Sequence, residues 1–278
     1  MKVIFKILPL CFSTLLLSQD VTKIKNLDNL QKERFFNLVN KDSKTIPFLN
    51  EHQLYLDSII SIIPEDPFYW QQKAMPLFKQ KKYELGMKYL NRAIEYDTTN
   101  HYKEYRAFIK CIFQKNYTKS LDEFLDLTKI NGDAIVMDHT YSFWIGLCYL
   151  QLNEFQLSKK SIEKSIAFGK VNNYINPYEL FYLGITEFEM GNYNEAIKNL
   201  DISINEYKNF ADAKYYKALS LAKIGKETDA KALFLESKSD FKNGFTFNEG
   251  NSLYEQFPYQ VSQFTYISSE KLFLTENN

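Results

Sequence analysis

The chain is poor in residues that break helices, with only nine glycines and seven prolines among 278 residues. That scarcity favours helices over a turn-rich β fold. The chain also lacks a net charge, because 34 basic residues balance 34 acidic ones. A nucleic-acid-binding surface shows a basic excess, so we expect no nucleic-acid partner. With 45% hydrophobic residues, the chain can still bury a sizeable core.

Long apolar runs are equally scarce, and the clearest one lies near the N-terminus. Residues 7–17 are mostly apolar, follow Lys2 and Lys6, and precede the small residue Ser18. The run is too short to span a bilayer, which needs about 20 residues. Its layout is that of a secretory signal peptide, so we expect residues 1–18 to be removed. The mature chain is then exported (periplasmic, envelope-associated or secreted) without a transmembrane segment, and its composition suggests a bacterial source. The alternative is a short N-terminal helix that stays in the protein.

Cysteine and histidine number three each, which limits metal and redox chemistry. Cys111 and Cys148 could form one disulfide after export, but the apolar content favours two buried thiols. His52, His101 and His139 lie far apart, and no Cys or His pair has the spacing of a zinc site. We expect His101 and His139 to be exposed. Since the sequence also lacks a phosphate loop and a nucleophile elbow, we predict no cofactor, no metal and no catalytic residues.

Aromatic residues are abundant, with 20 Tyr and 23 Phe, and some of them recur at a regular interval. Tyr83, Tyr117, Phe155 and Tyr193 follow one another at steps of 34, 38 and 38 residues, and a further step of 34 reaches Glu227. Small residues come three positions after these five anchors: Gly86, Ser120, Ser158, Ala196 and Ala230. Large apolar residues come seven positions after them: Leu90, Phe124, Ile162, Leu200 and Phe234. Nine positions before them lie Ala74, Phe108, Gly146, Gly184 and Ala218, of which only Phe108 is large.

This pattern resembles the tetratricopeptide repeat, a 34-residue helix–turn–helix unit. The best matches are "WQQKAMPLFKQKKYELGMKYLNRAI" from Trp70 and "LFYLGITEFEMGNYNEAIKNLDISI" from Leu180. The resemblance covers about residues 66–240 in five copies. It implies an all-α fold, a right-handed α-solenoid (superhelix) of antiparallel helix pairs. Small residues then mark where the first helix (helix A) and the second helix (helix B) of a pair approach closely, and Gly191 and Gly225 lie in the turns between them.

The two ends do not follow the repeat. We expect N-terminal helices with a degenerate repeat over residues 19–66, with Leu27, Leu30 and either Phe36 or Leu38 facing inward. The repeats proper then occupy residues 67–240. Residues 241–278 form a packed cap, a strand-like segment lying on the solenoid, or a partly ordered tail. Their aromatic content favours the packed cap.

In the tetratricopeptide family, helices A line a concave face that usually holds a peptide. Here those helices carry a stripe that is nearly all apolar. The candidate binding residues are Phe68, Gln71, Met75, Phe78, Tyr105, Ile109, Phe143, Leu147, Phe181, Ile185, Phe188 and Tyr215. Monomers rarely leave so large an apolar patch in water. We therefore expect it to be covered by an apolar segment of a partner, by the chain's own C-terminal region, or by a tighter superhelix.

The sequence thus predicts an exported, non-enzymatic scaffold that binds a protein or peptide with apolar or aromatic side chains. Replacing Phe143 and Phe181 by Ser is expected to abolish that binding without unfolding the protein. The alternative is a structural subunit of a cell-envelope or homo-oligomeric assembly. The identity of the partner and the oligomeric state are not determined by the sequence.

Overall fold

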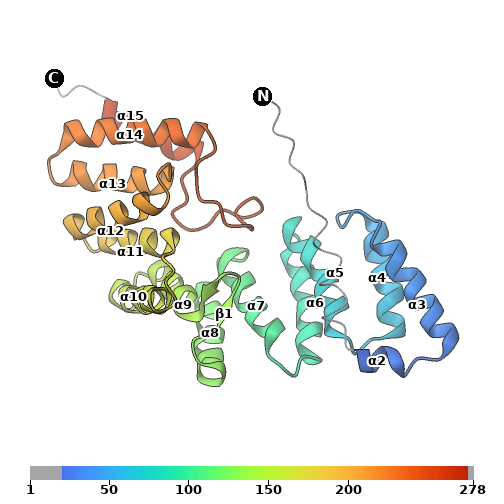
Figure 1. Ribbon diagram of the computed structural model, residues 1–278. Coiled ribbons are helices and arrows are strands. Elements are labelled where there is room, and N and C mark those ends of the chain that lie inside the picture. The colour runs from blue at the N-terminus through green and yellow to red at the C-terminus, as the bar shows by residue number, and fades with distance from the viewer. Residues whose placement is uncertain (1–20, 275–278) are drawn as a thin grey trace. The chain divides into compact units, whose positions relative to one another are not determined.

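The computed structural model describes residues 21–274, so the expected signal peptide lies outside the described residues. The described chain divides into two compact units, an N-terminal unit up to Lys103 and a C-terminal unit from Glu104 onward. Each unit consists of helices packed in sequence order (Figure 1). The division falls within helix α7 (His101–Ile112), after its third residue.

The described part of the N-terminal unit, from residue 21 onward, contains five complete helices. They are α2 (Val21–Lys25), α3 (Asn29–Asp42), α4 (Asn50–Ile62), α5 (Pro67–Lys79) and α6 (Tyr83–Glu95). Helices α3 and α4 pack as one pair and α5 and α6 as the next. Helix α4 supplies Leu56 and Ile60 to the core.

The start of α3 determines which of its faces is buried. Asp28 accepts a hydrogen bond from the Gln31 backbone N–H at 2.7 Å, and the Gln31 side chain accepts one from the Asp28 N–H at 3.0 Å. This capping box satisfies two backbone donors and sets the first turn. Phe35 is then fully buried, whereas Leu30 is 75% exposed and Phe36 is also exposed. The prediction was therefore wrong for Leu30, whereas Leu27 packs against the core, and of the two alternatives Phe36 and Leu38 it is Leu38 that does so.

Up to residue 274, the C-terminal unit contains four helix pairs followed by one more helix. After α7 come α8 (Tyr117–Asn131), α9 (Tyr141–Gln151), α10 (Phe155–Val171), α11 (Pro177–Glu189), α12 (Tyr193–Glu206), α13 (Ala211–Lys223), α14 (Glu227–Lys242) and α15 (Gln263–Leu274). Every helix B of the five repeats begins at its predicted anchor: Tyr83, Tyr117, Phe155, Tyr193 and Glu227. The predicted all-α arrangement of helix pairs is confirmed.

Glycines allow the closest approach between paired helices. A Cβ on Gly184 would lie 2.7 Å from Cγ of Leu200, the large residue seven positions after the Tyr193 anchor. No side chain fits at that distance, so the small residue is required for α11 and α12 to pack. Gly191 follows α11 with a φ of +78°, a left-handed conformation that ends the helix.

The two 38-residue steps have different structural origins. In the first, β1 (Ile135–Val136) pairs antiparallel with β2 (His139–Thr140) in a short hairpin. Both turn residues, Met137 and Asp138, have positive φ, as a tight hairpin turn requires. In the second, α10 extends to 17 residues. The periodicity showed that residues had been added but could not show the hairpin, because the strands are only two residues long.

Residues 243–262 form an irregular segment between α14 and α15. Figure 1 shows this segment leaving α14 and descending along the helix stack of the C-terminal unit before it returns to α15. Phe247, Phe257 and Val261 of the segment are buried. Helix α15 then packs on α14, with the rings of Phe273 and Phe234 stacked 4.3 Å apart. Residues 243–274 thus pack against the repeats.

Candidate functional site

The predicted binding residues of the C-terminal unit lie on one face formed by helices A, but most of them are inside the protein. Five have no exposed surface: Ile109, Phe143, Leu147, Phe181 and Ile185. Tyr105 and Tyr215 are also buried, and Phe188 is partly exposed. Truncating a fully buried Phe costs about 3–5 kcal/mol of stability. The expectation that Ser at positions 143 and 181 would leave the fold intact is therefore wrong.

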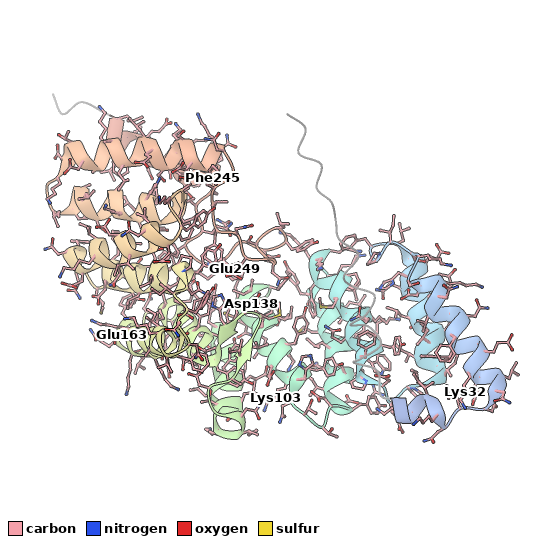
Figure 2. All side chains as sticks on the ribbon, in the orientation of Figure 1. Lys32, Lys103, Asp138, Glu163, Phe245 and Glu249 are labelled. Carbon is pink, nitrogen blue, oxygen red and sulfur yellow. The ribbon has the colours of Figure 1, made fainter. Side chains whose placement is uncertain are left out.

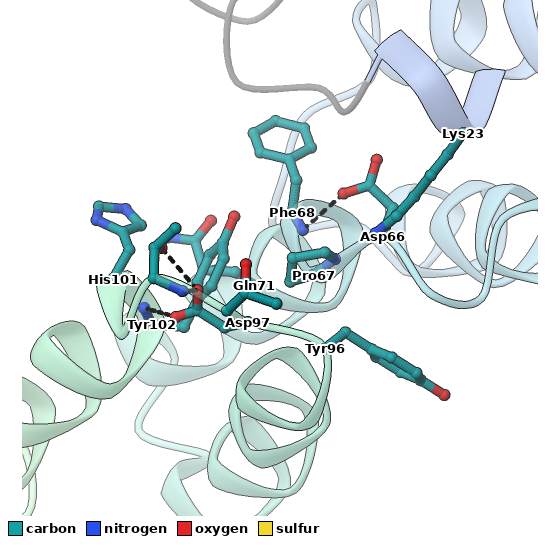
Figure 3. Close-up of a pocket in the computed structure, with 11 residues that line it drawn as sticks. Lys23, Asp66, Pro67, Phe68, Gln71, Tyr96, Asp97, His101 and Tyr102 are labelled. Carbon is teal, nitrogen blue, oxygen red and sulfur yellow. Dashed lines mark hydrogen bonds between the residues drawn. The ribbon is translucent and has the colours of Figure 1, made fainter. Parts of the chain in front are cut away.

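The predicted residues of the N-terminal unit lie on α5. Phe68 and Phe78 are buried, whereas Gln71 and Met75 are partly exposed. Phe68 and Gln71 line a pocket of about 370 Å³ (Figure 3). The rest of its wall is Lys23, Asp66, Pro67, Tyr96, Asp97, Thr98, Thr99, His101 and Tyr102. Asp97 accepts hydrogen bonds from the backbone N–H groups of Thr99 and Tyr102 at 2.8 and 2.7 Å, so its carboxylate shapes the wall of the pocket.

In the C-terminal unit, helices A hold the irregular C-terminal segment partly through its backbone. The Tyr182 hydroxyl donates to the Pro258 carbonyl at 2.9 Å, and the Tyr178 hydroxyl accepts from the Asn248 N–H at 3.3 Å. Lys115, just after α7, donates from Nζ to the Gln256 carbonyl. These contacts fix the path of a chain without depending on its side chains.

Asp212 in the first turn of α13 joins the two ends of this segment. Its Oδ2 accepts hydrogen bonds from the Thr246 hydroxyl at 2.8 Å and the Phe247 N–H at 2.9 Å, and its Oδ1 accepts from the Val261 N–H at 2.7 Å. Asp212 has no exposed surface. This burial raises the pKa of Asp212 to about 6, although the hydrogen bonds oppose the rise. The carboxylate therefore binds two stretches of the segment that are 14 positions apart, at residues 247 and 261.

Phe247 is the main aromatic anchor of the segment. Its ring lies 4.4 Å from Tyr178 and 4.8 Å from Phe257, measured between ring centroids. Three further rings surround it at 5.9–6.3 Å: Phe181, Tyr182 and Phe210. Aromatic pairs at such distances contribute about 0.5–1.5 kcal/mol beyond the burial of their area. The pocket therefore favours an aromatic side chain at this position.

Glu249, two residues later, contacts a buried histidine. His139 Nε2 lies 3.0 Å from Glu249 Oε1, and the imidazole stacks on Phe143 with 3.8 Å between centroids. On the other side, Nδ1 faces Asn176 at 3.4 Å and Glu179 at 3.9 Å. Burial lowers the pKa of His139, but the interactions with Glu179 and Glu249 outweigh it and raise the pKa above its ordinary value.

His139 was predicted to be exposed, and that prediction was wrong because the β1–β2 hairpin folds it into the interior. Figure 2 shows Glu249 close to Asp138, the residue before His139. The sequence analysis therefore missed the contacts made by Asp212 and His139, although it named the C-terminal region as one possible cover of this face. Asp212 stands at the start of a helix, where a carboxylate is ordinary, so its role had no distinctive signal.

The remaining sequence predictions concern thiols, metals and membranes. Cys111 and Cys148 are buried free thiols with their Sγ atoms 3.8 Å apart, as expected. Within residues 21–274, no cluster of three or more His, Cys, Asp or Glu side chains could hold a metal ion. Over the same range, every helix is too short or too polar to cross a bilayer.

Comparison with known proteins identifies the repeat. Sequence models of the tetratricopeptide repeat match residues 69–100, 139–168 and 180–209. These matches coincide with three of the helix pairs described above. No curated protein matches the chain in sequence.

Solved structures that resemble the chain include several bacterial proteins. PilW, a widely conserved type IV pilus biogenesis factor, aligns with a TM-score of 0.61 at 11% identity, over 78% of this chain and 96% of its own. The pilF protein of Pseudomonas aeruginosa aligns with 0.57 at 13% identity, over 78% and 98%. The C-terminal part of a tetratricopeptide protein from Cytophaga hutchinsonii aligns with 0.54 at 15% identity, over 77% and 79%. At these identities the likeness establishes the fold alone.

Proposed function

Because this chain is a tetratricopeptide repeat protein, we propose that it is a non-enzymatic scaffold that binds a segment of a partner protein on the face formed by its helices A. One observation carries the proposal: the C-terminal unit holds an irregular stretch of polypeptide on that face. The face therefore has the groups that a peptide needs. Hydroxyl and carboxylate groups bind the backbone, and an aromatic pocket binds a side chain.

We propose a separate partner contact on the N-terminal unit. Gln71 and Met75 on α5 retain exposed surface, and the pocket beside Gln71 has a volume of about 370 Å³. Pockets of about 300 Å³ or more are large enough to bury a side chain or a small group of atoms. We propose that this pocket takes an apolar or aromatic side chain of the partner, with Phe68 as part of its lining.

We further propose that the protein acts after export. The support is the N-terminal sequence, in which two lysines precede an apolar run and a small residue. N-terminal sequencing of the protein purified from its source tests this directly. A mature chain that begins near residue 19 is expected, and a chain that retains residues 1–18 contradicts export by this route.

Site-specific photo-crosslinking in the source organism tests the scaffold. A photoreactive phenylalanine at Gln71 reports on helix A, and the same residue at Lys88, exposed on helix B of the same repeat, is the matched control. We expect a discrete crosslinked partner from position 71 and none from position 88. Crosslinks from position 88 alone, or from neither position, contradict the proposed binding face.

An assembly role is favoured by one different observation. Helix α15 exposes Phe264, Ile267 and Leu272, although the last helix of a repeat array needs a polar outer face to remain soluble. This apolar surface fits a second candidate function, that of a structural subunit which buries α15 against a neighbouring chain. Sedimentation equilibrium distinguishes the candidates, because a stable monomer excludes a permanent homo-oligomer.

A further inference from the structure

The irregular C-terminal segment is held in the way that a repeat scaffold would hold a partner. We propose that the helix A face of the C-terminal unit is a recognition site for a partner segment with an aromatic residue followed two positions later by a carboxylate. Residues 245–249 of the chain are then its resident, displaceable occupant. This inference rests on the proposed scaffold function and specifies its ligand.

The aromatic requirement follows from the pocket around Phe247. The pocket walls from helices A are the rings of Tyr178, Phe181 and Tyr182. The Phe247 side chain is 2% exposed, so the pocket encloses nearly all of it. A smaller side chain would leave a void among these rings, and a charged one would be buried without a partner.

The acidic requirement follows from His139. The imidazole of His139 is buried, and its Nε2 lies 3.0 Å from Glu249 Oε1. A buried ring N–H that loses its acceptor costs free energy, because water cannot replace the lost hydrogen bond. Glu179 faces the opposite nitrogen, so it cannot take the place of the incoming carboxylate. A Lys at this position would replace the carboxylate acceptor beside Nε2 with a group that can only donate.

The spacing between the two anchors is set by the backbone contacts. Asp212 binds the Phe247 N–H and the Tyr178 hydroxyl binds the Asn248 N–H, so consecutive peptide groups of the occupant are fixed. Any residue except proline supplies a backbone N–H at these two positions. The side chain of Asn248, between the anchors, is exposed and contributes no specificity.

The way the segment is attached permits its exchange. It is joined to α14 through Asn243 and Gly244, with Gly244 at a φ of +85° and open space around it. Beyond Glu249 the chain enters a loop in which Gly250 has open space around it and Leu253 is 87% exposed. The anchored residues therefore lie between Gly244 and Gly250, two glycines with open space around them, and they can leave without unwinding a helix.

Exchange is tested with a fluorescent synthetic peptide of residues 244–262 and the full-length chain. The Phe247→Ala chain has a weakened resident segment, whereas its groove on helices A is unchanged. Fluorescence anisotropy should show that this variant binds the wild-type peptide about tenfold or more tightly than the wild-type chain does, because a larger fraction of its grooves is open. Equal affinity for the two chains overturns the proposal.

Peptide variants test the recognition pattern on the same Phe247→Ala chain. Peptides with Phe247→Ala or Glu249→Lys should each bind about tenfold or more weakly than the wild-type peptide, since each loses one anchor. The Asn248→Ala peptide is the matched control and should bind like wild type. An equal loss for all three peptides overturns the pattern.

A second variant and the crosslinking experiment distinguish failure of this inference from failure of the fold or of the scaffold function. If circular dichroism shows that the Phe247→Ala chain is unfolded, the Glu249→Ala chain takes its place, because it removes only the contact with His139. Crosslinking from Gln71 in the N-terminal unit is independent of this groove. Crosslinks there without peptide exchange sustain the scaffold function and overturn this inference. Peptide exchange without crosslinks overturns the proposed contact at Gln71 and sustains the groove of the C-terminal unit as the binding site.

Discussion

Replacing the buried Asp212 by Asn should remove a pH dependence of stability that the wild-type protein shows. The pKa of Asp212 is about 6 in the folded protein, against an ordinary value of 3.8. At pH values between 3.8 and about 6, the folded state binds more protons than the unfolded state. The free energy of unfolding therefore falls as the pH rises through this range. The two values differ by about two pH units at about 1.4 kcal/mol each, which amounts to about 3 kcal/mol. Asn does not titrate, so it contributes nothing to this fall.

The comparison has to separate charge from hydrogen bonding. Asn keeps one acceptor oxygen, so either the Phe247 N–H or the Val261 N–H loses its partner, which lowers stability by the same amount at every pH. The informative quantity is therefore the difference in unfolding free energy between variant and wild type, measured by urea denaturation and circular dichroism.

From about pH 4 to about pH 8 this difference should shift by about 3 kcal/mol in favour of the Asp212→Asn variant. Asp229→Asn is the control, since that residue lies in the first turn of α14 but is exposed to solvent. A difference that is the same at both pH values would refute the burial of a charged Asp212.

Two further predictions concern the helix contact and the histidine. Gly184→Ala places a Cβ 2.7 Å from Leu200, so overpacking of about 1–3 kcal/mol should outweigh the gain in helix propensity of about 1 kcal/mol, and the melting temperature should fall. Gly250→Ala, with nothing within 4 Å, should not lower it, and an equal effect at both glycines contradicts the packing argument. Glu249→Gln should lower the pKa of His139, because it removes one of the two carboxylates that raise it. An NMR titration of the imidazole measures this, and an unchanged pKa means that Glu249 does not act on His139.

The helix pairs could be predicted because their determinants are local. Each anchor, from Tyr83 to Glu227, begins its helix B, and Gly191 ends a helix A where the pattern places it. Helical periodicity and glycine caps depend on residues that are close in the sequence, so they can be predicted from it. The error at Leu30 has a local cause as well, because the capping box at Asp28 determined the phase of α3.

The candidate site could be predicted only in part. The apolar stripe on helices A was identified from the sequence, including Phe143 and Phe181, but the sequence left open what covers it. The answer depends on contacts between distant residues, such as His139 with Glu249, which are 110 positions apart. No repeat period connects such residues, because one of them lies in an inserted hairpin and the other lies beyond the last repeat.

By itself, then, the amino-acid sequence determined a stack of antiparallel helix pairs with an apolar face, since periodic side chains specify helices and their neighbours. Only the tertiary structure decided that the C-terminal segment lies on this face and that Asp212 and His139 hold it there. The physical reason is that a buried carboxylate or imidazole is defined by its partners, and those partners meet only when the chain has folded.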